Sequence, residues 1–120
     1  MIVLNSNIAR DASSLQMQWL RTDLQANSGK TCTLAYWHHP RFSSGTHSND
    51  ATQAAFWDTL YSYNADVILN GHEHNYERFA PQTPSATADN VRGIREFIVG
   101  TGGRELRVKG TTKANSQGGP

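Results

Sequence analysis

The five histidines of this 120-residue chain fall into two clusters. The first holds His38 and His39, with His47 further along the same segment, and the second is the His-x-His of His72 and His74. Neutral imidazole is a good ligand for zinc, iron or manganese. The two clusters therefore predict a metal site, and the alternative is that these histidines are solvated or capping residues of polar loops.

The spacing of His72 and His74 has a physical meaning of its own. In a regular strand the two rings would point to opposite faces, whereas at a bend they can spread apart and serve two sites. Two-metal hydrolases hold their ions about 4 Å apart, so one histidine for each ion suits this spacing. Gly71 comes directly before the pair and is expected to permit the tight backbone path.

The elements that position the histidines alternate between strands and helices. We predict strands over residues 2–4, 31–37, 66–69 and 94–99, and helices over residues 13–27 and 50–63. Polar loops are predicted over residues 38–49 and 71–78. Each histidine cluster follows a predicted strand, and the strand-helix-strand-helix-strand order with a further strand is typical of an α/β layered fold. In such folds ligand groups gather at the carboxyl ends of strands.

The composition is ordinary and sets few limits. The chain has 11 basic and 10 acidic residues, a net charge of +1, which favours neither nucleic acid nor a membrane surface as partner. The sequence has no apolar run of membrane-spanning length. Cys32 lies in an apolar run and is predicted to be a small buried residue. Residues 108–120 have almost no apolar side chains and are predicted to form a mobile tail.

A family resemblance starts from the second cluster. Residues 71–78, Gly-His-Glu-His-Asn-Tyr-Glu-Arg, closely resemble the Gly-His-x-His-x-Tyr-Glu-Arg motif of purple-acid-phosphatase-like enzymes, which are calcineurin-like metallophosphoesterases. Residues 37–40, Trp-His-His-Pro, are similar to the preceding family motif, a metal-binding histidine shortly before a proline. The resemblance extends over residues 1–107 and implies the C-terminal, histidine-bearing part of a phosphoesterase domain.

The resemblance implies a role for individual residues. His38 and His72 match ligands of the second metal of the family, and His74 matches a ligand of the first. His47 matches, by its offset from His38, a histidine that hydrogen-bonds the phosphoryl oxygens or protonates the leaving alcohol. The residues expected to support these groups without binding metal are His39, Gly71, Tyr76, Glu77 and Arg78, with Glu77 orienting a histidine.

The chain also departs from the family pattern. The family supplies an Asp-x-His, a Gly-Asp that bridges the metals and an Asn-His, and none of these occurs in the sequence. The complete enzyme is expected to use two divalent or trivalent ions, Fe, Zn or Mn. Two such ions repel strongly without a bridging carboxylate, so this chain alone is expected to hold at most one ion and to be inactive towards phosphate esters.

The expected fold is half of an α/β/β/α sandwich, which leaves an apolar sheet face exposed. We expect the missing N-terminal half, or self-association, to cover that face. The alternative is a non-catalytic remnant or fragment that binds one metal ion or a protein partner. The family is often secreted or periplasmic, but the sequence assigns no compartment to this chain.

Overall fold

Five strands and two α-helices form the fold in the computed structural model, which describes residues 1–118. The elements in chain order are β1 (Ile2–Val3), α1 (Leu15–Ala26), β2 (Leu34–Trp37), a 3₁₀ turn (Ala51–Gln53), α2 (Ala54–Ser62), β3 (Val67–Asn70), β4 (Tyr76–Arg78) and β5 (Arg95–Val99). The predicted alternation of strands and helices is confirmed. The structure adds β4, which the polar composition of residues 71–78 concealed.

The strands form one mixed sheet in the order β1-β2-β3-β5-β4. Neighbours are parallel from β1 to β5, and β4 runs antiparallel to β5 at the edge. The carboxyl ends of β2 and β3 are level, because Trp37 pairs with Asn70. Residues that directly follow these two strands are therefore neighbours in space, which is where both histidine clusters begin.

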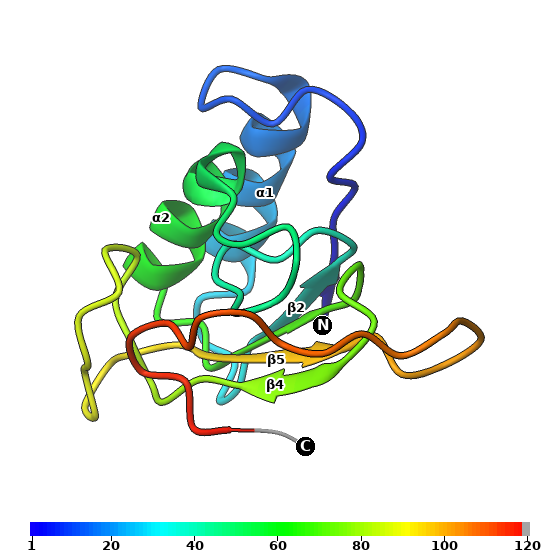
Figure 1. Cartoon of the computed structure of the whole chain (residues 1–120). Helices are drawn as coiled ribbons and strands as arrows, with labels where there is room; N and C mark the ends of the chain where they lie inside the picture. The colour runs from blue at the N-terminus through cyan, green and yellow to red at the C-terminus, as the bar shows by residue number, and fades with distance from the viewer. Residues whose placement is uncertain (119–120) are drawn as a thin grey trace.

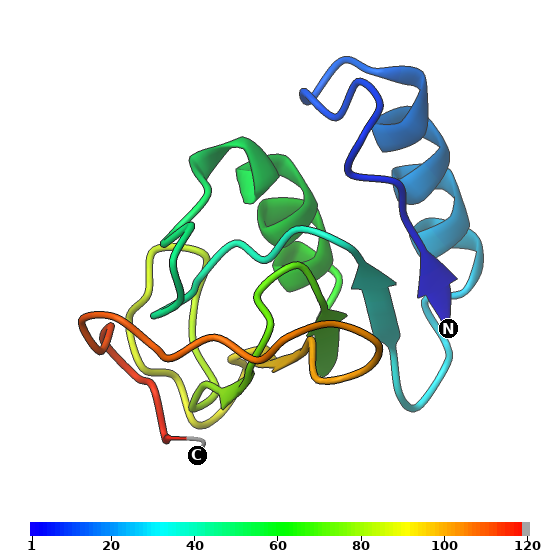
Figure 2. The same ribbon diagram turned by 45° about the vertical axis from the view of Figure 1, so that its right-hand side comes forward.

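Both helices lie on the same side of the sheet (Figures 1 and 2). Apolar side chains of α1 and α2 meet those of the strands in one core. The contacts include an edge-on pair of Trp37 with Phe56, whose ring centroids lie 5.2 Å apart, and a second edge-on pair of Phe42 with Trp57 at 4.9 Å. This core anchors the strands and also the first residues of the loop after β2.

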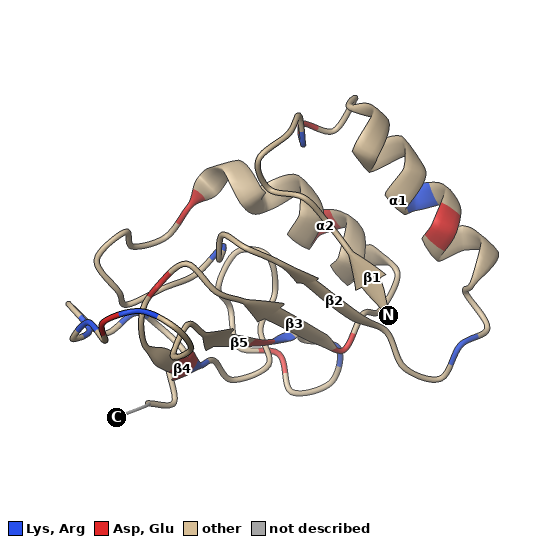
Figure 3. Cartoon of the chain, turned by 90° about the vertical axis from the view of Figure 1, so that its right-hand side faces the viewer, with Lys and Arg blue, Asp and Glu red and all other residues tan. Residues whose placement is uncertain are grey.

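The helix starts follow local capping chemistry. The side chain of Ser14 accepts a hydrogen bond from Met17 N and caps α1, which begins at Leu15, two residues after the start of the predicted helix. The Asp50 side chain accepts from Thr52 N and begins the 3₁₀ turn that leads into α2. Figure 3 shows basic and acidic residues interspersed along these elements. Within residues 1–118, no helix is both long and apolar enough to cross a membrane.

The opposite face of the sheet is open and apolar. The strand register places Val3, Tyr36, Leu69 and Phe97 in one row across four strands, and Val99 continues the row along β5. Val3 is 54% exposed, Tyr36 38% and Val99 53%. We call these five residues the open-face row. Helices cover one face of the sheet and the other is open, as expected for half of a sandwich.

The C-terminal segment has defined contacts in the structure. Residues 108–118 pass the loop after β2 and then lie beside β4 (Figure 1). Gly110 N donates to Ser44 O at 2.6 Å, Ala80 N to Asn115 O at 2.8 Å, and Ser116 Oγ to Glu77 at 2.6 Å. The division of the chain at residue 107, and the mobility of the tail, stay predictions. Residues 119 and 120 of that tail lie outside the described residues.

One expectation about burial is wrong. Cys32 is exposed, because the strand begins only at Leu34 and Cys32 belongs to the connection that precedes it. The strand predicted over residues 31–37 is therefore too long at its N-terminal end. The thiol is an exposed group at the end of the sheet opposite to the histidines.

Candidate metal centre

His38 and His72 meet at the carboxyl ends of β2 and β3. Each comes after a strand of the parallel pair, and Gly71 N donates to His38 O at 3.0 Å. His38 Nε2 lies 3.1 Å from His72 Nδ1. Two nitrogens bound tetrahedrally at about 2.0–2.1 Å from one zinc ion are roughly 3.3 Å apart. The spacing of the two rings therefore fits two ligands of the same ion.

The bend that presents His72 is made by His72 itself. Its φ is 65°, in the left-handed region that L residues seldom adopt, although histidine is enriched there. Gly71 was expected to make this turn, but it has no positive φ, and a methyl group on it would find ordinary contact with His38 at 3.6 Å. The positive φ at the end of β3 is thus adopted by a candidate ligand residue, and such strained positions are common at functional sites.

His39 belongs to the same group of rings. The potential ligand atoms of His38, His39 and His72 all lie within 4.8 Å of one another. His39 Nδ1 hydrogen-bonds Ser6 Oγ at 2.7 Å, which leaves Nε2 as its other nitrogen. The prediction gave His39 a supporting place only, whereas this geometry also makes it a potential third ligand.

His74 borders the cavity next to this group. The cavity has a volume of about 410 Å³, and His38, His47, His72 and His74 all line it. Among residues 1–118, His74 Nδ1 is buried and has no hydrogen-bond partner. The carboxylate of Glu105 lies 3.7 Å from it. Buried polar atoms are normally paired, so an orphaned imidazole nitrogen suits a residue whose partner is an ion.

Burial lowers the pKa of two of these rings. The pKa of His72 is lowered, mainly because burial disfavours the charged ring and further because His39, His47 and His38 are close. The pKa of His39 is lowered for the same leading reason, with His38 the next contributor. Metal ions bind the neutral imidazole. The crowding of rings therefore favours the protonation state that a ligand needs.

His47 lies against the metal-binding candidates but has a different partner. Its ring centroid is 4.2 Å from that of His72. His47 Nδ1 lies 3.2 Å from Glu73 Oε1, and the Glu73 side chain is fully buried. From the sequence, Glu73 was only the variable position of the His-x-His motif. Its position between two histidines was the sequence feature that could have marked it as a site residue.

The residues expected to support the loop form β4 and its contacts. Tyr76 and Arg78 pair with Val99 and Phe97 of β5. Glu77 is fully buried and accepts from Ser44 N at 2.9 Å and from Ser116 Oγ. Glu77 thus holds the loop after β2 and the C-terminal segment, whereas the hydrogen bond to a histidine expected of it is made by Glu73.

Two arginines that were not predicted as site residues also line the cavity. Arg104 and Arg107 line it together with the histidines. Both pair with Glu105, at 2.8 and 3.4 Å. The glycine-rich turn at residues 100–103 was the available signal, because it directs the chain after β5 back over the second cluster. Guanidinium groups here offer donors suited to phosphoryl oxygens.

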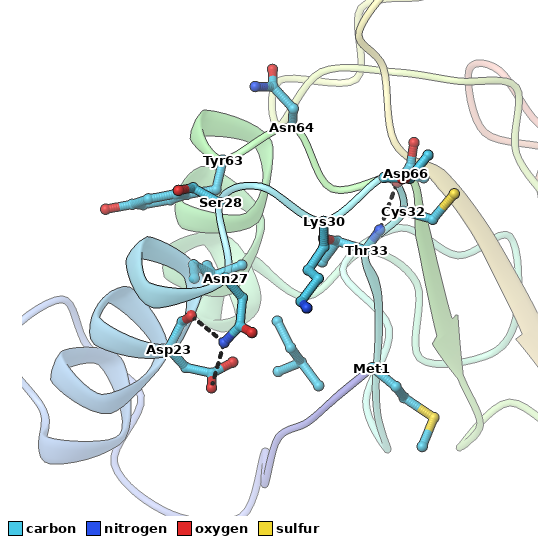
Figure 4. A pocket seen from close by; sticks show the side chains of 13 residues that line it. Met1, Asp23, Asn27, Ser28, Lys30, Cys32, Thr33, Tyr63, Asn64 and Asp66 are labelled. Atoms are coloured by element: carbon cyan, nitrogen blue, oxygen red, sulfur yellow. Dashed lines mark hydrogen bonds between the residues drawn. The ribbon is translucent and has the colours of Figure 1, made fainter.

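A larger cavity at the other end of the strands has a different character. It has a volume of about 750 Å³ and is lined by residues that precede β2 and β3 and by the end of α1. Figure 4 shows the Asp66 carboxylate hydrogen-bonded to Thr33 N, at 2.7 Å, and Asn27 bonded to Asp23. None of the predicted site residues lines this cavity. The candidate chemistry is confined to the carboxyl ends of the strands.

Several acid phosphatases are similar to this chain in sequence. Purple acid phosphatase 15 of Arabidopsis thaliana is 41% identical over 83 residues, which cover 64% of this chain and 15% of the relative. Acid phosphatase A of Cryphonectria parasitica is 35% identical over 97 residues, covering 73% and 19%. Human acid phosphatase type 7 is 29% identical over 118 residues, covering 78% and 27%. The chain thus spans about a fifth of the length of these curated relatives.

Comparison of folds agrees with the sequence matches. A purple acid phosphatase from yellow lupin seeds, PPD1, superposes with a TM-score of 0.83 at 16% identity, over 95% of this chain and 23% of that protein. GAP50 of Plasmodium, described as the anchor in the inner membrane complex, superposes with a TM-score of 0.74 at 14% identity, over 96% and 36%. These likenesses show a shared fold.

A family model settles the relationship. The model described as calcineurin-like phosphoesterase matches residues 3–76, which include both histidine clusters. The predicted fold class, a fragment of the phosphoesterase fold, is confirmed by the lupin structure. The chain therefore belongs to the calcineurin-like phosphoesterase family.

Proposed function

We propose that this chain provides the histidine side of a dinuclear metal centre that hydrolyses phosphate esters. One observation carries the proposal: His38 Nε2 and His72 Nδ1 lie 3.1 Å apart at the level ends of two parallel strands. His74 and His47 border the cavity beside them. Purple acid phosphatases among the relatives favour a phosphate ester as substrate.

Each residue has a defined part in this proposal. His38 and His72 hold one ion, and His74 holds the other through a nitrogen that lacks a hydrogen-bond partner among residues 1–118. The two ions, Fe, Zn or Mn, supply activation of water and neutralise charge on the phosphoryl group. His47 hydrogen-bonds a phosphoryl oxygen or protonates the leaving alcohol. Arg104 and Arg107 line the same cavity and bind phosphoryl oxygens.

The chain alone is proposed to be inactive. The group of potential ligands within residues 1–118 consists of three imidazoles and includes no carboxylate. Nothing in that group offsets the repulsion between two cations. We therefore propose at most one ion in this chain, and hydrolysis only together with the carboxylate-bearing part of the domain.

A second candidate function is binding of a single ion without catalysis. It is favoured by the compact group of His38, His39 and His72, whose ligand atoms lie within 4.8 Å of one another. Three histidines with one open position are a common zinc arrangement. The two candidates differ in the third residue, which is His74 on a second ion in the first and His39 on the same ion in the second.

Zinc titration by calorimetry, with hydrolysis of p-nitrophenyl phosphate, tests both candidates. We expect the chain to bind at most one zinc ion and to hydrolyse the ester no faster than the buffer with zinc. His72→Ala should weaken zinc binding by more than about 100-fold, because removing even an outer partner of a ligand costs 10–100-fold.

His39→Ala and His74→Ala are the matched variants that separate the candidates. A loss of similar size in His39→Ala, with binding retained in His74→Ala, establishes the single-ion site. If His39→Ala retains zinc binding, the ion is held by His38 and His72, as in the first candidate. Turnover by this chain that His72→Ala abolishes would contradict the proposed incompleteness, and zinc binding unaffected by His72→Ala would contradict both candidates.

The open-face row is proposed as the surface that the rest of the domain covers. It is apolar, partly exposed, and adjoins a hollow of about 500 Å³ lined by Tyr36, Leu69 and Val99 among others. A second sheet packed there would complete the sandwich. In its absence, a second copy of the chain is the alternative cover.

A further inference from the structure

Three buried carboxylates hold the loop that carries His47. Each comes from the β4–β5 side of the sheet or from the His-x-His loop, and each accepts backbone N–H groups of residues 41–47. The bonds are Arg41 N to Glu96 at 3.2 Å, Ser44 N to Glu77 at 2.9 Å, Thr46 N to Glu73 at 3.1 Å and His47 N to Glu73 at 2.7 Å. The exposed fraction of all three glutamates is 0%.

Glu73 differs from the other two because it also reaches a side chain. Its Oε1 lies 3.2 Å from His47 Nδ1, in addition to the bond from His47 N. An ionised carboxylate only accepts hydrogen bonds, so a hydrogen bond between it and His47 requires the proton to be on Nδ1 of the imidazole. The hydrogen bond at one ring nitrogen determines the state of the other. Nε2 is then the nitrogen that remains for a substrate.

The packing around Glu73 leaves its carboxyl group little freedom. Gly45 lies directly on it, and a Cβ at Gly45 would overlap the Glu73 carboxyl group. Gly100 lies against the Glu73 carbonyl, where a Cβ would also overlap. The His47 ring, which contacts the Glu73 carboxylate, also packs against the His72 ring, and the two ring centroids lie 4.2 Å apart. Glycine is required on both approaches, so the geometry depends on the absence of side chains there.

We propose that Glu73 is a positioning residue for His47. Its carboxylate holds the proton on Nδ1 and fixes the ring, so that Nε2 is the atom presented to the phosphoryl group. Nε2 then accepts a hydrogen bond while the ring is neutral and donates one when the ring is protonated. The inference rests on the proposed function, in which His47 faces the substrate, and it adds the residue that orients it.

Nuclear magnetic resonance of the histidine side chains tests the inference in this chain, without metal or substrate. The ¹⁵N shifts of the ring nitrogens show which of the two carries the proton in a neutral imidazole. We expect His47 to be protonated on Nδ1 in the wild-type chain. Glu73→Met removes the acceptor with an unbranched side chain of similar length, and its His47 signals should move to the average of the two tautomers.

Glu77→Met is the matched control, because it also removes a buried carboxylate from the same loop but leaves His47 Nδ1 its partner. Its His47 signals should stay at the wild-type positions. A wild-type His47 protonated on Nε2 overturns the proposal, as does a folded Glu73→Met chain with unchanged signals, or an equal change in Glu77→Met.

The outcome does not depend on catalysis. The wild-type spectrum alone can overturn the hydrogen bond, so the proposal stays testable if Glu73→Met fails to fold. Failure of the proposed function would appear in zinc binding and ester hydrolysis, whereas failure of this inference appears in the tautomer of His47.

Discussion

At the scale of single residues, the unusual feature is the number of buried carboxylates beside the candidate centre. Burial of an ionised carboxylate is costly unless hydrogen bonds compensate. Glu73 and Glu77 have partners on both oxygens. Glu96 has a partner on Oε1, whereas its Oε2 has none among residues 1–118. The pKa of Glu96 is accordingly raised well above its ordinary value of 4.5, first by burial.

This raised pKa predicts a pH-dependent effect of Glu96→Gln. Between 4.5 and its raised pKa, Glu96 binds a proton in the folded chain more than in the unfolded chain. Stability from this group is therefore full at low pH and is lost as the pH rises through that window. Glutamine mimics the protonated form at every pH. The free energy of unfolding of Glu96→Gln, relative to wild type, should rise between pH 5 and pH 8, measured by urea denaturation.

Glu105→Gln is the control for that measurement. The pKa of Glu105 is lowered, first by a hydrogen bond from its own backbone and next by Arg104, so its neutral analogue should gain nothing over wild type as the pH rises. A Glu96→Gln chain whose relative stability is constant or falls with rising pH would show that Glu96 is ionised in the fold.

At the scale of elements, the sequence predicted what depends on local pattern. The helices and four of the strands follow from apolar periodicity and caps, and the strand ends located both histidine clusters. The strand β4 was missed because it is a short strand of polar residues, Tyr76–Arg78, at the edge of the sheet. The roles of Glu73 and Glu96 could not be predicted, because each acts on a loop at least 26 residues away in the chain. The bend at His72 was likewise assigned to its neighbour Gly71.

The loop after β2 offers a test of how tightly these elements fit. Gly45→Ala places a methyl group where the Glu73 carboxyl group lies, and that group is held by Thr46 N and His47 N. We expect the variant to lose roughly 1–3 kcal/mol of unfolding free energy, the usual cost of overpacking, measured by chemical denaturation. The same variant should also lose the preference of the His47 ring for the tautomer protonated on Nδ1.

Gly29→Ala is the matched control for this substitution. A Cβ at Gly29 meets nothing within 4 Å, and its φ is not positive. Such a change should be neutral or slightly stabilising, by up to about 1 kcal/mol. Equal destabilisation of both variants would mean that the contact between Gly45 and Glu73 does not decide the stability of the loop.

At the scale of the whole molecule, the two faces of the sheet are unequal. Helices α1 and α2 lie on one face of the sheet (Figure 3). The open-face row lies on the other face. A contiguous apolar surface of this kind marks an interface. The chain spans about a fifth of the length of its curated relatives, and the proposed cover for that face is the rest of such a domain.

The open face predicts concentration-dependent self-association of this chain on its own. Tyr36 lies in the row between Val3 and Leu69 and is 38% exposed, so Tyr36→Lys should place a charge within the interface and shift the chain towards monomer in sedimentation equilibrium. Leu15→Lys is the control, since Leu15 is 83% exposed but begins α1 on the covered side of the sheet. A chain that is monomeric at every concentration, or equal effects of both variants, would show that the open-face row is not the interface.

The open-face row also adjoins the candidate metal centre, because Gly71 and His38 line the same hollow. Whatever covers this face therefore also reaches the edge of that centre.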